Sequence, residues 1–122
     1  MCLQPRGRII NAVAEMVLLK RVQALLELPT AGPDAPTLMH MERTLTDGYA
    51  WALALEAERA RLARRLGDLA ARETGNPAAK TDELATLARK MAEADVDLAR
   101  LRRSLSLLRR RATAVRAATA VA

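Results

Sequence analysis

The feature that most constrains the fold is a run of apolar residues, spaced alternately three and four positions apart, over the last third of the chain. This spacing repeats every seven residues and places the side chains along one stripe of a helix, as in a coiled-coil seam. The run comprises Leu84, Leu87, Met91, Ala94, Leu98, Leu101, Leu105, Leu108, Ala112 and Val115. A second run, with one polar member, comprises Leu38, Met41, Leu45, Gly48, Ala52, Leu55, Arg59, Leu62, Leu66 and Leu69. Two long helices that pack along these stripes are therefore expected.

Two stretches rich in proline and glycine divide the chain. "LPTAGPDAP" at 28–36 and "TGNPA" at 74–78 are incompatible with a continuous helix. The segments that they leave predict three helices, at roughly 8–28, 37–73 and 77–118.

The second break offers two starting points for the last helix. Asn76 is a favourable N-cap residue, and Pro77 suits the first helical position. Thr81, which is followed by the acids Asp82 and Glu83, is a rival N-cap. In either case the connection is short, so the two long helices are expected to be antiparallel neighbours.

Composition agrees with a helical core. The chain of 122 residues is 51% hydrophobic but only 2% aromatic, so leucine, alanine, valine and methionine must fill the interior. We expect an all-α fold: a long antiparallel coiled-coil helical hairpin with a shorter N-terminal helix packed at its base. The expected organisation is an N-terminal helix and proline-rich loop at 1–36 and a hairpin at 37–122, together forming one domain. The excess of arginine and alanine is typical of a high-GC coding sequence and favours a bacterial source.

A register for the hairpin follows from folding the chain about residues 76–77. Facing positions then have numbers that sum to 153, which matches leucine with leucine at several levels. The same register sets Gly48 opposite Leu105 and Met41 opposite Ala112. Small residues facing large ones are what close packing requires.

Arg59 is the polar member of the second run, and it falls opposite Ala94 in this register. Carboxylates surround the position, from Glu56 on its own helix and from Asp95 on the other. We interpret Arg59, Glu56 and Asp95 as a polar layer that fixes the helix register. The alternative, a buried site for an anionic ligand, is disfavoured because the carboxylates would repel an anion.

The segment 9–28 is apolar on most sides, which is typical of a helix buried between partners. We expect it to run back along the base of helix 37–73 and to leave apolar surface uncovered, so that the chain forms a homodimer or binds another protein. A membrane-surface helix is a weaker alternative, because the basic residues form no separate face. The candidate packing and association residues are Tyr49, Trp51, Leu53, Val13 and Val17.

The net charge of +6 comes from the end of the chain, since residues 100–122 contain no acid. Glu42 is expected to reach Arg109 across the hairpin. The remaining positive charge predicts an acidic partner, a nucleic acid or simply a solvated face. A nucleic acid is disfavoured because the arginines alternate with no aromatic residues and no reader motif is present. The candidate partner-binding residues are Arg102, Arg103, Arg109, Arg110 and Arg116.

The sequence offers no catalytic set, metal site or cofactor motif. His40 is the only histidine and Cys2 the only cysteine, which is too few for a metal site or a nucleophile with its base. The charged N-terminal run is unsuited to a signal peptide or a membrane span. We therefore expect a non-enzymatic, cytoplasmic protein without a cofactor or transmembrane segment.

The expected helix pair resembles the hairpins of small bacterial anti-sigma proteins that sense cyclic-di-GMP, but their Glu-Ser-Arg-Gln-Asp ligand spacing is not found here. WXG-type hairpins carry Trp-x-Gly at the turn, where this chain has "TGNP". Neither family is assigned. The sequence favours a protein–protein interaction module that self-associates and binds a regulatory protein with an acidic surface. The alternative is a nucleic-acid-associated or transcription-regulating protein, similar to an anti-sigma protein, that uses the basic C-terminal helix.

Overall fold

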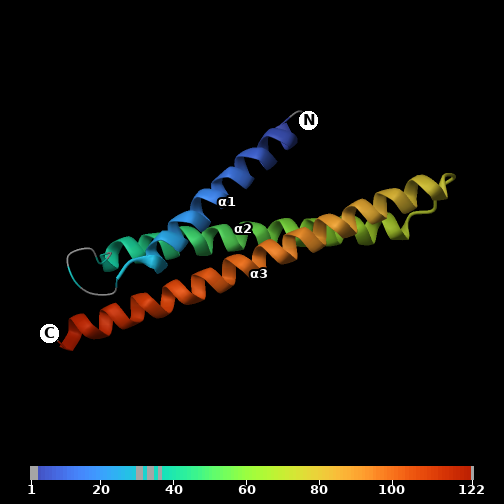
Figure 1. Cartoon of the computed structure of the whole chain (residues 1–122). Helices are drawn as coiled ribbons and strands as arrows, with labels where there is room; N and C mark the ends of the chain where they lie inside the picture. Colours follow the sequence, from blue (N-terminus) through green and yellow to red (C-terminus); the bar gives the residue numbers. More distant parts are fainter. Residues whose placement is uncertain (1–2, 30–31, 33–34, 36, 122) are drawn as a thin grey trace. The chain divides into compact units, whose positions relative to one another are not determined.

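The computed structural model describes residues 3–29, 32, 35 and 37–121, with side chains from Val13 to Thr119 outside the same gaps. The described residues form three α-helices and no strand (Figure 1). They are α1 (Leu3–Glu27), α2 (Leu38–Ala71) and α3 (Pro77–Val121). The all-α prediction and the number of helices are confirmed, and both long helices end within three residues of their predicted limits.

The helix ends follow from capping residues. Thr37 accepts a hydrogen bond at Oγ1 from the backbone N–H of His40, which caps the start of α2. Asn76 accepts one at Oδ1 from the N–H of Ala79 (3.2 Å), and Pro77 is the first residue of α3. Thr81 instead donates its hydroxyl proton to the carbonyl of Pro77 inside the helix. Of the two predicted starts, Asn76 is therefore correct.

The helices form two compact units, whose boundary crosses both long helices. Unit 1 comprises residues 1–51 and 101–122, and unit 2 comprises residues 52–100. In unit 1 the three helices pack together, and all of the largest fully buried side chains lie there. These are Met41, Leu101, Leu105, Leu108, Val22 and Thr44.

The core of unit 1 draws on one face of each helix. Among the α1 side chains that the structure describes, the buried ones are Leu18, Val22 and Leu25, at the spacing of a single helix face. Thr44 of α2 is fully buried, and its hydroxyl oxygen accepts a hydrogen bond from the guanidinium of Arg21 (3.2 Å). The same guanidinium binds Asp47 at 3.1 Å, so one arginine of α1 holds two positions of α2.

Gly48 and Leu105 approach each other closely in unit 1. A Cβ atom built on Gly48 would lie 2.2 Å from Cδ2 of Leu105. The predicted pairing of these two residues is therefore confirmed, and it also explains why this helix contains a buried glycine.

Unit 2 consists of the end of α2, the connection at 72–76 and the beginning of α3. Its buried residues include Leu62, Leu87 and Leu98. Lys80 donates hydrogen bonds from Nζ to the carbonyl oxygens of Ala70 and Arg72. These are carbonyls at the end of α2 that lack helical partners, so a side chain from α3 caps the preceding helix.

Candidate functional site

The arginine-rich part of α3 is exposed along its outer side. The seam residues in this part are buried, except for the half-buried Val115, and the five predicted residues are all exposed: Arg102, Arg103, Arg109, Arg110 and Arg116. Arg111 differs, since its guanidinium donates a hydrogen bond to the backbone carbonyl of Leu28 just beyond α1. Arg111 therefore holds the first helix against α3, while the five predicted residues remain at the surface.

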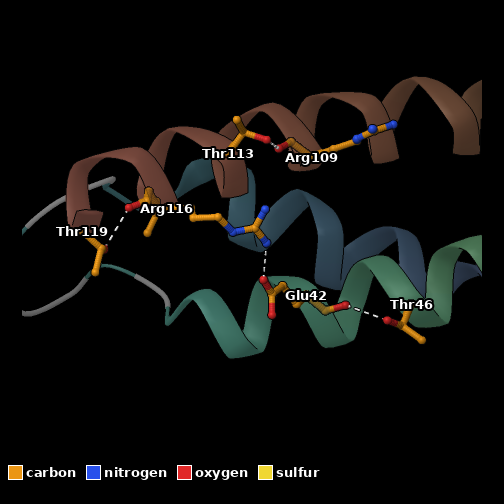
Figure 2. A network of polar contacts seen from close by, with 7 residues as sticks. Glu42, Thr46, Arg109, Thr113, Arg116 and Thr119 are labelled. Carbon is orange, nitrogen blue, oxygen red and sulfur yellow. Dashed lines mark hydrogen bonds and ion pairs between the residues drawn. The ribbon is translucent and has the colours of Figure 1, made fainter. Parts of the chain in front are cut away.

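Two of the exposed arginines already have partners within the chain. Arg116 forms an ion pair with Glu42 of α2 (Figure 2), and Arg102 also takes part in a contact. The expected pair between Glu42 and Arg109 is wrong. Each helical side chain leans toward the N-terminus of its own helix, so in an antiparallel pair Glu42 and Arg116 lean toward each other. Arg109 leans away from Glu42.

The guanidinium groups of Arg103, Arg109 and Arg110 have no ion pair within the part of the chain that the structure describes. We call these three residues the arginine face; Arg103 and Arg110 lie on one side of α3, and Arg109 lies about 100° around the helix from Arg110. Near Arg109, the hydroxyl of Thr113 donates to the backbone carbonyl of Arg109 (2.9 Å; Figure 2) and leaves the guanidinium uninvolved. The arginine face therefore combines three unneutralised cations on two turns of one helix.

An exposed leucine accompanies these cations. Leu107 is 45% exposed, and it lies four residues after Arg103 and three before Arg110, so the three side chains are neighbours on one helix surface. The exposed position of the arginines was predicted from the sequence, whereas that of Leu107 was not. The seven-residue spacing of Arg103 and Arg110 around an off-seam leucine was the available signal.

The outer side of α1 is a second candidate surface. Val13, Met16 and Val17 are 56%, 56% and 52% exposed. Their spacing of three and four places them on one side of the helix. The structure thus leaves Val13 and Val17, both predicted association residues, available for contact.

The other predicted association residues lie on α2. Tyr49 is 43% and Leu53 is 67% exposed, and Trp51 is half-buried. The cover that α1 was expected to give Tyr49 and Leu53 is therefore absent. Arg21 brings α1 to the side of α2 that carries Thr44 and Asp47, and a helix turns about 100° per residue, which puts Tyr49 on the opposite side.

Trp51 carries an unusual polar atom. Its indole Nε1 is the one buried side-chain nitrogen or oxygen without a hydrogen-bond partner among the described residues. A buried tryptophan N–H normally has an acceptor. Burial of this donor costs free energy that the surrounding apolar packing must offset.

The predicted polar layer lies in unit 2. Arg59 forms an ion pair with Asp95, and the side chains are 44% and 50% exposed. The arginine thus reaches from a seam position to the surface. Glu56 also takes part in a contact. An exposed pair of this kind contributes little to stability, which agrees with a role in register.

No site for a metal or small ligand is apparent in the described residues. They contain no group of three or more His, Cys, Asp or Glu side chains that could hold a metal ion. His40 is exposed at the start of α2, and Cys2 lies outside the described residues. An open hollow of about 170 Å³ in unit 2 has Arg65, Arg72, Asp68 and Glu83 at its edges, so its charges are mixed.

The apolar character of the helices and three comparisons with known proteins bear on the class of protein. None of the described helices combines the length and apolar character needed to cross a membrane. The chain matches no protein-family model, no curated protein and no solved structure. Any functional assignment must therefore come from the surfaces described above.

Proposed function

We propose that this protein is a non-enzymatic protein–protein interaction module that self-associates through α1 and binds an acidic regulatory partner through α3. The scaffold in this proposal is an antiparallel coiled-coil hairpin formed by α2 and α3. Three features support the proposal as a whole. They are the burial of the seam residues, the apolar outer side of α1 and the unneutralised arginine face.

Burial along the two stripes supports the coiled coil. Every seam residue from Leu84 to Val115 is buried or half-buried, and so is every one from Leu38 to Leu69 except Arg59. The contact between Gly48 and Leu105 has the register expected of knobs-into-holes packing. An interaction module needs a rigid frame of this kind to present its surfaces.

The observation that carries self-association is the exposure of Val13, Met16 and Val17. Each of these residues exposes about half of its surface to solvent, so complete burial of one would add about half of the ~1.5–3 kcal/mol that burial of a fully exposed side chain contributes. Three neighbours on successive turns form a continuous apolar surface of the type found at interfaces. A second copy of the chain offers the same surface, as a twofold interface requires.

Light scattering coupled to gel filtration tests this assignment. We expect the protein to be a dimer, and the variant Val13→Ser/Met16→Gln/Val17→Ser to be a monomer with unchanged helix content. Val96→Ser is the control, because Val96 is equally exposed (57%) but lies on α3 in unit 2. A parent protein that stays monomeric at every concentration would remove self-association from the proposal.

A further inference from the structure

We infer that the arginine face and Leu107 together bind an amphipathic helix of a partner protein, with carboxylates seven residues apart on either side of an apolar residue. This inference rests on the proposed function and gives its acidic partner a specific chemistry. It follows from the spacing of the face, the charge of the chain and the nature of Leu107.

The spacing of two arginines on α3 determines the spacing of the acids in the partner. Arg103 and Arg110 are separated by seven residues, which is about 10.5 Å along α3 at 1.5 Å per residue. A helix that runs alongside α3 presents its own residues at the same interval. Carboxylates seven residues apart on that helix therefore reach both guanidinium groups. Each carboxylate can accept a bidentate, charge-assisted pair of hydrogen bonds from its arginine.

The charge of the chain favours an acid that comes from another protein. Unit 2 contains nine basic and nine acidic residues, so the whole net charge of +6 belongs to unit 1. Residues 1–51 are themselves balanced, which leaves the end of α3 as the source of that charge. A second copy repeats this distribution and brings no acidic excess. Charge complementarity thus selects a different, acidic protein.

Leu107 favours a protein over a nucleic acid as the partner of this surface. Phosphates would engage the arginines but would gain nothing from an exposed leucine, since backbone binding is electrostatic. An amphipathic helix buries its own apolar residue against Leu107 while its carboxylates reach Arg103 and Arg110. Interfaces of proteins commonly combine arginine with an apolar anchor in this way.

Fluorescence anisotropy of labelled probes, with the full-length protein at physiological salt, tests the inference. One probe is a helical peptide with glutamates seven residues apart flanking a leucine; a second has the same composition with the glutamates on other faces. A DNA duplex and vesicles containing phosphatidylserine are the remaining probes. We expect the first peptide to bind about tenfold tighter than the second, a difference of roughly 1.4 kcal/mol.

Matched variants locate the binding. Arg103→Gln/Arg109→Gln/Arg110→Gln should weaken binding of the first peptide by about tenfold or more. Arg64→Gln/Arg65→Gln/Arg89→Gln removes the same charge from exposed positions of unit 2 and should change the binding by less than about twofold. Leu107→Ser should weaken binding of the peptide and leave binding of the duplex unchanged.

Three results would overturn the inference. They are equal binding of the two peptides, tighter binding of the duplex or vesicles than of the first peptide, and equal loss in the two triple variants. Light scattering on the same samples keeps the two proposals separate. If the peptide fails to bind while the protein remains a dimer, only the inference about α3 is lost.

Discussion

At the scale of single residues, the absence of a side chain on Gly48 allows α2 to approach α3 within unit 1. Leu105 fills the space where a methyl group would lie, and its side chain is 1% exposed. Cγ and Cδ1 of Leu105 also lie 3.2 Å from the position of that methyl group, so the whole leucine side chain would have to shift within a closely packed core. The glycine is thus required by packing, not by backbone conformation.

Replacement of Gly48 by alanine is expected to destabilise the protein. Overpacking costs about 1–3 kcal/mol, against a gain of up to about 1 kcal/mol in helix propensity. Gly67→Ala is the control, since Gly67 lies in the same helix with nothing within 4 Å of its added Cβ, and this change should raise the melting temperature. Thermal denaturation followed by circular dichroism measures both. A Gly48→Ala protein as stable as the Gly67→Ala protein would contradict the close approach.

At the scale of helices, the connection between α2 and α3 is defined by residues from both of its sides. Asn76 caps the beginning of α3, while Lys80 reaches back to the last carbonyls of α2. Each contact satisfies backbone groups that a helix end leaves without partners. The reversal of the chain in unit 2 therefore depends on local hydrogen bonds as well as on seam packing.

Asn76→Ala is expected to cost about 1 kcal/mol through loss of the N-cap. Thr81→Ala serves as the control, because Thr81 bonds to the carbonyl of Pro77 inside the helix and caps nothing, and it should change stability by less than about 0.5 kcal/mol. Chemical denaturation gives both free energies of unfolding. If Thr81→Ala costs more free energy of unfolding than Asn76→Ala, Thr81 would be the N-cap of α3.

The polar layer gives a second prediction for the helices. Arg59→Leu should keep or raise the melting temperature, because a leucine fits the seam and the lost ion pair is exposed. The same change should broaden the range of oligomers seen by light scattering, since a polar seam residue specifies the pairing. A large loss of stability with an unchanged oligomer would count against the role in register.

The sequence predicted the three helices from periodicity and from proline and glycine, and it also predicted the contact between Gly48 and Leu105. The seven-residue spacing identified both apolar stripes. The register in which facing residue numbers sum to 153 placed Gly48 against Leu105. The contacts that the sequence missed depend on long side chains, whose direction is set by the helix geometry. Arg116 replaced Arg109 as the partner of Glu42 for this reason, and the capping role of Lys80 was not foreseen. The side of α2 against which α1 packs could not be predicted from the sequence either, because α1 is apolar on most sides.

At the scale of the whole molecule, burial is uneven. The side chains of Met41, Leu101, Leu105 and Leu108 are nearly inaccessible in unit 1, whereas Leu62, Leu87 and Leu98 of unit 2 are 4–5% exposed. Three helices contribute to the first core and parts of two helices to the second. Local stability is expected to follow this difference.

Native-state hydrogen exchange should therefore show slower exchange for the backbone amides of residues 101–112 than for those of residues 84–98, although both belong to α3. The difference arises because opening of unit 1 exposes more apolar surface. Mass spectrometry of peptides from the exchanged protein provides the measurement. Uniform protection along α3 would mean that the two units open together.

The position of the boundary between the units has a consequence for cleavage by proteases. Residues 51–52 and 100–101 are helical, so a protease finds no extended segment at which to separate unit 1 from unit 2. Trypsin has an exposed arginine in the connection after α2, Arg72, but no lysine or arginine between residues 28 and 37. Limited digestion would thus yield fragments 1–72 and 73–122. Each fragment contains part of both units and the whole of neither, so we expect the two products to be complementary halves that fold only together.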